Sequence, residues 1–292
     1  MKIINTNEKL HSINTVGMIS KPNDTTLRIY YEDIKKALEK HGVELLVEEN
    51  SANILGCKGV DFKSMCEKSD FLISLGGDGT LISLSRRSFM YKKPILGIYA
   101  GKLGFLTDIE SCEIESFIDK IFEGDYRIDT RMLLEVTLHT KSSQEKLVAF
   151  NDIVFSRAKI SGMTTIRAYI ENELFNSYYG DGLIVSTPTG STAYNISAGG
   201  PIVYPLTEAL ILTPVCPHSL TQRPLVLPVN FEVEFKSENK DTVIVVDGQD
   251  TYQMGDFDSI SIKIAKSGAK LIHRLDRDYF EVLKNKLHWG NV

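Results

Sequence analysis

No stretch of this 292-residue sequence approaches the roughly 18 consecutive apolar residues that a membrane-spanning helix needs. Its first residues also lack the apolar core of a secretory signal. Cysteine is scarce, and the four cysteines lie far apart without a CxxC pair, which argues against a disulfide framework or a zinc ribbon. We therefore expect a cytoplasmic protein with reduced thiols and no membrane partner.

An excess of basic charge is also missing. The formal net charge is -5, whereas a protein that holds nucleic acid through a broad basic surface carries clustered Lys and Arg. We expect no nucleic-acid partner and favour small-molecule ligands. Because single domains usually run to roughly 100–200 residues, the length suggests two domains.

Residues 15–121 alternate short apolar runs with helical stretches. A helix is expected to start after Asn23 or Asp24 and to run to Lys40. Strands separated by helices predict a parallel, Rossmann-like sheet covered on both faces. The expected strands are 16–19, 43–47, 70–75 and 94–98.

After Tyr126 the pattern changes to short strand-like runs joined by polar turns, which predicts a β-sandwich-like second domain. Helical spacing returns at 276–287, and we expect that helix to pack on the first domain. The predicted division is 1–125, 126–274 and 275–292. The expected strands of the second domain are 132–139, 147–155, 164–170, 173–179, 225–227, 231–235, 243–246 and 260–264.

The strongest local signal is the glycine-rich turn Gly-Gly-Asp-Gly-Thr at 76–80, which follows the third strand and precedes a helical stretch. Glycines at the carboxyl end of a parallel strand let backbone N–H groups approach phosphate oxygens at a helix N-terminus. The alternative is an ordinary turn with Asp78 as the helix N-cap. The turn matches neither a Walker A loop nor the GxGxxG fingerprint.

Two further segments carry candidate chemistry. A second glycine-containing turn at 100–107 follows the next strand, so it should lie beside the first turn; alternatively it is a plain loop with Phe105 and Leu106 in the core. The segment 179–201 is dense in small and hydroxyl residues, which leave room for a ligand, and Tyr194 could stack on a base. The alternative for this segment is a set of tight β-turns.

Taken together, these segments resemble the NAD kinase family. The match consists of GGDGT at 76–80, GKLGFLT at 101–107, the pair Asn151 and Asp152, the block 180–201 and CPHSL at 216–220, all in the family's order. The GGDGT core alone is less specific, because it resembles a motif shared with diacylglycerol, sphingosine and phosphofructokinase-type kinases.

The resemblance implies transfer of a phosphoryl group from ATP, or a similar donor, to the 2′-hydroxyl of the adenosine ribose of NAD, giving NADP. It also implies Mg2+ or another divalent cation and a homodimer or homotetramer. In this reading Asp78 is the catalytic carboxylate, and Asn151 and Asp152 hold the adenosine. Asp181 lies near the nicotinamide end. The other implied binding residues are Gly76, Gly77, Gly79, Thr80, Gly101, Phe105, Thr192, Ala193, Tyr194 and Ser197.

Several residues invite a simpler interpretation. Tyr99 stands where the family commonly has Asn, and a phenol does not offer the paired donor and acceptor of a carboxamide. Cys216 and His218 are too few for a metal site. At most one of the adjacent residues Arg86 and Arg87 should reach a phosphate, since adjacent helical side chains point about 100° apart. Arg274 and Arg277 resemble solvated surface charges.

Two other functions remain open at this stage. A lipid or sphingoid kinase could share the GGDGT core, but it needs an apolar acyl channel, and the block 180–201 is polar. A catalytically silent nucleotide sensor could bind NAD without phosphorylating it, although retention of Asp78 argues against that interpretation.

Overall fold

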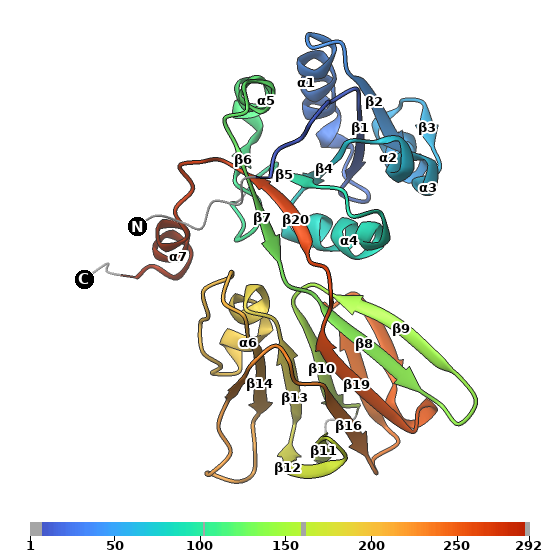
Figure 1. The fold of residues 1–292 in the computed structure, drawn as a ribbon, viewed down its shortest axis with the longest axis vertical. Coiled ribbons are helices and arrows are strands. Elements are labelled where there is room, and N and C mark those ends of the chain that lie inside the picture. Colours follow the sequence, from blue (N-terminus) through green and yellow to red (C-terminus); the bar gives the residue numbers. More distant parts are fainter. Residues whose placement is uncertain (1–7, 102, 159–161, 290–292) are drawn as a thin grey trace. The chain divides into compact units, whose positions relative to one another are not determined.

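The computed structural model describes residues 8–101, 103–158 and 162–289. The chain divides into two compact units. The first unit contains Met1–Thr130 and Ala269–Val292, and the second contains Arg131–Gly268. The first unit is therefore assembled from both ends of the chain, and the division falls at 130/131 and 268/269 (Figure 1).

The first unit is built on an eight-stranded sheet with the order β3-β2-β1-β4-β5-β20-β7, and β6 pairs with β5. β1 pairs in parallel with β2 and β4, and β5 pairs in parallel with β4 and β20. The expected Rossmann-like sheet is confirmed. Its strands are β1 (Thr15–Ser20), β2 (Glu44–Glu48), β3 (Gly59–Val60), β4 (Phe71–Gly76), β5 (Ile95–Tyr99), β6 (Ile109–Glu110), β7 (Arg127–Arg131) and β20 (Ala269–His273).

Helices cover both faces of this sheet. Val16 and Met18 point into a core shared with α1 and α5. Gly17 faces the opposite way, where a Cβ would come within 2.8 Å of Met65 in α3. Asp24 caps the short 3-10 helix Thr25–Leu27 instead of starting α1 itself. The helices are α1 (Arg28–Glu39), α2 (Glu49–Leu55), α3 (Phe62–Lys68), α4 (Asp78–Ser88), α5 (Ile114–Glu123) and α7 (Tyr279–Leu287).

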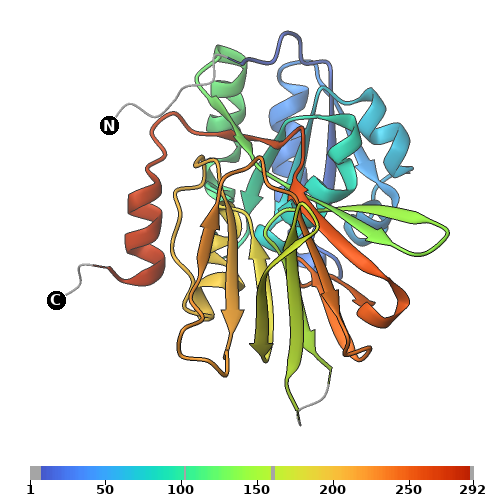
Figure 2. The ribbon, with the colours of Figure 1, turned by 60° about the horizontal axis from the view of Figure 1, so that its bottom comes forward.

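The second unit contains two six-stranded sheets (Figures 1 and 2). Their strand orders are β15-β14-β13-β10-β17-β18 and β12-β11-β16-β19-β8-β9. Apart from these strands it contains the short helix α6 (Tyr194–Ser197). The strands are β8 (Leu134–His139), β9 (Gln144–Ala149), β10 (Asp152–Arg157), β11 (Thr164–Ile170), β12 (Glu173–Gly180), β13 (Gly182–Ser186), β14 (Leu210–Val215), β15 (Leu225–Leu227), β16 (Val233–Ser237), β17 (Thr242–Val246), β18 (Asp250–Gln253) and β19 (Ser259–Ile264).

Side chains from both sheets meet in one apolar core, as in a β-sandwich. Phe155 of β10 and Phe235 of β16 belong to different sheets, and their rings lie 5.0 Å apart. The expected single strand at 147–155 is wrong, because a turn at Phe150 and Asn151 separates β9 from β10. The sandwich-like architecture itself is confirmed.

The topology of the first sheet brings the two glycine-containing turns together. β1 pairs with β2 on one side and with β4 on the other, so the strand order reverses at this point. In the register of β4 and β5, Gly76 lies opposite Tyr99. The segments that follow these two residues therefore leave the sheet at the same edge, where ligands bind in folds of this type.

Candidate active site

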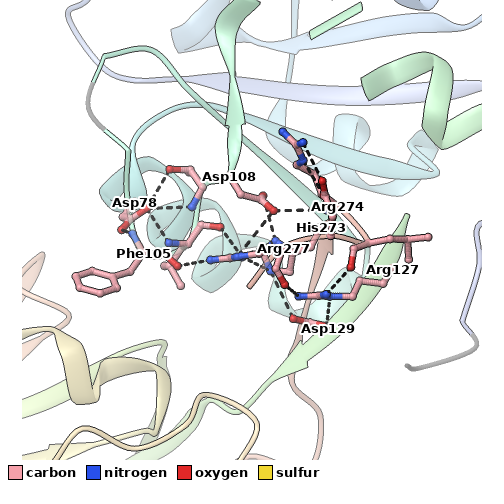
Figure 3. Close-up of polar contacts among 12 residues, drawn as sticks. Asp78, Phe105, Asp108, Arg127, Asp129, His273, Arg274 and Arg277 are labelled. Carbon is pink, nitrogen blue, oxygen red and sulfur yellow. Dashed lines mark hydrogen bonds and ion pairs between the residues drawn. The ribbon is translucent and has the colours of Figure 1, made fainter. Parts of the chain in front are cut away.

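Asp78 is the first residue of α4, and its carboxylate binds the neighbouring loop. Oδ2 accepts a hydrogen bond from the backbone N–H of Phe105 at 2.7 Å. Oδ1 accepts from the N–H groups of Leu106 and Thr107 and from the Thr107 hydroxyl, each at 3.2 Å (Figure 3). Gly77 occupies the N-cap position. The alternative in which Asp78 is the N-cap is therefore wrong.

Gly104 makes this approach possible, and sequence reasoning missed it. A Cβ at Gly104 would lie 1.9 Å from Asp78 Oδ1, so any other residue would push the carboxylate away. A Cβ at Gly77 or Gly79 meets no atom of the described residues within 4 Å. The start of α4 thus offers open space beside backbone N–H groups, which suits an anion.

A buried group of charged side chains lies behind the loop, and Figure 3 shows its members. Arg277 contacts His273, and its Nε lies 3.8 Å from Asp108 Oδ2. His273 Nδ1 lies 3.1 Å from Asp108 Oδ1. Arg127 pairs with Asp129 at 3.3 Å. All five side chains are almost completely buried, so the charges are held in low-dielectric surroundings.

The prediction that Arg277 is a solvated surface charge is wrong, because only 4% of its side chain is exposed. Arg274 differs from it. Its guanidinium pairs with Glu113 at 2.6 Å and with Asp276 at 3.0 Å, and 31% of its side chain is exposed. Sequence position alone does not distinguish these two arginines, which are three residues apart.

Burial and neighbouring charges together determine the protonation states of His273 and Asp108. Burial, with the nearby Arg277, lowers the pKa of His273 to about 4, so its imidazole is neutral at pH 7. Burial alone raises the pKa of Asp108, but His273 and Arg277 outweigh it, and the pKa lies below its ordinary value. Asp108 is therefore the ionised partner of the Arg277 guanidinium.

Arg87 is engaged away from the glycine turn. Its guanidinium pairs with the buried Glu48 at 3.0 Å and stacks on the ring of Phe62 at 4.0 Å. Tyr99, the departure from the family pattern, is half-buried at the end of β5, opposite Gly76.

In the second unit, Asp247 organises the predicted pair Asn151 and Asp152. Its carboxylate accepts hydrogen bonds from three successive backbone N–H groups, those of Phe150 at 2.7 Å, Asn151 at 2.6 Å and Asp152 at 3.0 Å. Asp247 and Gly248 lie in the turn between the paired strands β17 and β18, and their φ angles are 51° and 65°. Positive φ angles at both residues are typical of an Asp-Gly hairpin turn. The Asp-Gly dipeptide predicts such a hairpin, but it does not predict what the carboxylate binds.

Asp152 has an unusual environment. Burial, together with the negative charge of Asp247, raises the pKa of Asp152 to about 7. The backbone N–H of Tyr194 donates a hydrogen bond to Asp152, which opposes this shift. The side chain of Asp152 therefore changes its charge near neutral pH.

The block 189–197 lies against the same pair. A Cβ at Gly190 would lie 2.1 Å from the Asn151 carbonyl oxygen, so this glycine allows close packing. Asn195 is buried and donates to the Ser191 carbonyl at 3.0 Å, which holds the block in shape. Thr192 and Ala193 are half-buried, whereas Tyr194 and Ser197 are exposed. This exposure leaves Tyr194 and Ser197 accessible to a ligand.

Asp181 and Tyr194 line one pocket of about 300 Å³. Asp181 Oδ1 forms an ion pair at 2.8 Å with Nε of Arg157, which also lines this pocket. Gly182 and Val215 also contribute to the wall. The pocket thus joins two predicted binding residues that lie thirteen positions apart in the sequence.

Cys216 is a free, exposed cysteine, whereas His218 contacts Tyr179. The backbone N–H of His218 donates to the Tyr179 carbonyl at 2.9 Å, and the two rings meet edge to face at 5.7 Å. Within the described ranges no group of three or more His, Cys, Asp or Glu side chains is arranged to hold a metal ion. Similarly, no helix there is long and apolar enough to cross a membrane.

The predicted residues thus form two groups. The glycines 76, 77 and 79, with Thr80, Gly101 and Phe105, belong to the first unit around Asp78. The others belong to the second unit around Asp152. The first unit has a Rossmann-like sheet with a carboxylate in a glycine turn, and the second is a β-sandwich with a polar pocket. This combination defines a two-domain kinase of the GGDGT type.

Comparison with known proteins specifies the family. The ATP-NAD kinase N-terminal domain matches residues 16–126, and the ATP-NAD kinase C-terminal domain matches residues 150–274. The chain belongs to the NAD kinase family, and it is an enzyme, a kinase. The NAD kinase of Sulfurimonas denitrificans is 48% identical over 95% of this chain and 98% of its own length. The NAD kinase of Wolinella succinogenes is 48% identical over 98% and 99%.

Two solved structures are also similar. The yeast NADH kinase complexed with NADH superposes with a TM-score of 0.87 and 25% identity, covering 96% of this chain and 89% of that one. The Archaeoglobus fulgidus NAD kinase in complex with ATP gives a TM-score of 0.73 and 26% identity, covering 94% and 98%.

The raised pKa of Asp152 can be tested directly. Carbon-13 NMR of the Asp152 carboxyl should show a titration midpoint near pH 7. Asp247→Asn removes the neighbouring negative charge and should move the midpoint to lower pH. The exposed Asp256 provides a control, since Asp256→Asn should leave the midpoint in place. A wild-type midpoint near pH 4 would contradict the assignment.

Proposed function

We propose that this chain transfers the terminal phosphoryl group of ATP to the 2′-hydroxyl of the adenosine ribose of NAD, giving NADP and ADP, and that Asp78 accepts the hydroxyl proton. The observation that carries this proposal is the carboxylate of Asp78 at the open amino end of α4. Phosphoryl transfer depends on positioning and charge more than on covalent chemistry. A fixed carboxylate beside an anion-binding helix end supplies both.

The hydrogen bonds of Asp78 leave room for this role. A carboxylate has about four lone-pair positions. Among the described residues, Oδ1 accepts three hydrogen bonds, whereas Oδ2 accepts one, from Phe105. Oδ2 therefore keeps a position for the ribose hydroxyl. The residues Gly76, Gly77, Gly79, Thr80 and Gly101 are proposed to face the donor phosphates.

The second unit is proposed to bind NAD. Asp152 accepts hydrogen bonds from ribose hydroxyls, and Asn151 offers both a donor and an acceptor to the adenine edge. Thr192, Ala193, Tyr194 and Ser197 surround the adenosine, with the exposed Tyr194 ring available to stack on a base. The pocket containing Asp181 is proposed to take the nicotinamide end.

A divalent cation is proposed to accompany the donor, bound by phosphate oxygens and water. Since the described side chains include no cluster with the donor set of a metal site, we assign no step to the ion. The cytoplasm is proposed as the location, in keeping with four free cysteines.

The role of Asp78 predicts the effect of its replacement. Asp78→Asn should keep the fold and NAD binding but lower turnover by about 10² to 10⁴-fold, the usual contribution of a general base. NADP formation from NAD and ATP with magnesium measures this loss. Asp33→Asn, on the exposed face of α1, is a matched control that should retain full activity. Near-normal turnover of Asp78→Asn would refute the assignment.

The role of Asp152 predicts a change in selectivity. Its charge repels a phosphate already on the ribose, so the enzyme should prefer NAD to NADP. Asp152→Asn should weaken NAD binding by about 1–3 kcal/mol and reduce this preference. Calorimetry with both nucleotides at pH 8, where the wild-type side chain is ionised, measures the two constants. An unchanged ratio would show that Asp152 does not contact the ribose.

A homo-oligomer, dimer or tetramer, is proposed on the basis of an exposed apolar surface in the second unit. We call it the edge patch; it comprises Leu174, Phe175, Tyr179, Leu220, Leu225 and Val226. β12 and β15 are edge strands of the two sheets. The pair Asn176–Gln222 links the first three residues to the loop that carries Leu220. Exposed apolar side chains gathered on edge strands are typical of an interface.

This proposal can be checked by adding charge to the edge patch. Leu220 and Val226 are 86% and 47% exposed, so Leu220→Glu with Val226→Lys should leave the fold of the subunit intact. Light scattering should show wild-type oligomers and variant monomers. Met90→Glu, at a residue 79% exposed in the first unit, should not change the mass. A wild-type monomer at micromolar concentration would contradict the proposal.

A further inference from the structure

Arg277 lies on the segment between β20 and α7, far from the glycine turns in sequence. Its guanidinium nevertheless reaches the loop that binds Asp78. One terminal nitrogen donates to the carbonyl oxygen of Phe105, and the other donates to that of Leu106 at 3.4 Å (Figure 3). A planar guanidinium suits such a two-carbonyl contact, whereas the single ammonium of lysine does not.

The two contacted carbonyls belong to particular peptide units. The carbonyl of Phe105 shares its peptide with the N–H of Leu106, and the carbonyl of Leu106 shares its peptide with the N–H of Thr107. Both N–H groups donate to Asp78 Oδ1 at 3.2 Å. Two peptide units therefore stand between a buried cation and the Asp78 carboxylate. Each is hydrogen-bonded at both ends, an arrangement in which the bonds strengthen one another.

The surroundings of Arg277 hold it in this position. Arg127 donates to the carbonyl oxygens of Leu275 at 3.1 Å and Arg277 at 3.2 Å, so it fixes the backbone of the segment. The guanidinium of Arg277 faces ionised Asp108 and neutral His273. Asp129 lies behind them, 3.8 Å from His273 and paired with Arg127.

We propose that Arg277 is a positioning residue for phosphoryl transfer: it aligns the peptides of Phe105 and Leu106, and through them it orients the Asp78 carboxylate toward the acceptor hydroxyl. The proposal rests on the proposed role of Asp78. Arg277 acts only through the loop, so its loss lowers the rate of the chemical step and spares NAD binding, which belongs to residues 151–197 of the second unit.

A residue that merely stabilises the fold would lower the amount of active enzyme in any background. A residue that acts through Asp78 has no further effect once Asp78 has lost its function. A double-mutant cycle separates these cases, since residues that act as a unit are strongly non-additive. The required proteins are wild type, Arg277→Met, Asp78→Asn and the double variant.

Turnover is measured with labelled ATP, and NAD affinity is measured by calorimetry. Arg277→Met should lower kcat by up to about 100-fold, the cost of a misplaced group of about 1 Å, with the NAD dissociation constant unchanged within about twofold. In the Asp78→Asn background the same substitution should change kcat by less than about twofold. Arg277→Lys should lose most of the same activity, because one ammonium cannot contact both carbonyls.

Two further variants provide controls. Arg277→Met leaves Asp108 buried without its counter-ion, which can prevent folding. Arg277→Met combined with Asp108→Asn removes both charges and tests the same prediction in a neutral interior. Arg274→Met, three residues away at the surface, should keep wild-type kcat.

The outcomes are distinct. Unchanged kcat in the Arg277 variants, or an equal loss with and without Asp78, would overturn the positioning role while leaving the proposed function intact. Full activity of Asp78→Asn would instead refute the proposed function, and the positioning role with it.

Discussion

The geometry of the candidate active site in the first unit depends on one interaction, the hydrogen bonding of the Asp78 carboxylate to three successive backbone N–H groups of residues 105–107. This interaction joins the turn after β4 to the turn after β5. It requires a glycine at position 104, and it links two glycine-containing segments that the parallel pairing of β4 and β5 already places at the same sheet edge. The buried charges on the far side of the loop support the same peptides.

The second unit contains a similar hydrogen-bond arrangement. Asp247 accepts hydrogen bonds from the N–H groups of residues 150–152, so a carboxylate again fixes three successive peptides beside a proposed ligand site. Here the fixed segment carries Asn151 and Asp152. The proximity of two carboxylates, together with burial, keeps the pKa of Asp152 near 7. Asp247 therefore both fixes the backbone position of Asp152 and contributes to its raised pKa.

Much of this architecture could be predicted from local pattern. β1, β4, β11 and β17 follow their apolar periods, and the positions of Gly76–Thr80 and 101–107 follow from parallel topology. β13 (Gly182–Ser186) was missed although its apolar run Leu183–Val185 is typical of a strand, because it lies inside the segment 179–201 that was interpreted as a ligand-binding block. The roles of Arg277 and Asp247 were not predicted, because their partners lie about 170 and 95 residues away in the sequence. No local sequence signal encodes such contacts.

The construction of the first unit from both chain ends affects the order of events during synthesis. The ribosome completes residues 1–130 and then the whole second unit before it delivers β20 and Arg277. Domains commonly fold as the chain emerges, the earlier one first. In this protein the second unit can finish folding while the sheet that carries Asp78 still lacks an interior strand. The nascent enzyme thus acquires its last sheet strand and its buried guanidinium only after the whole second unit has been translated.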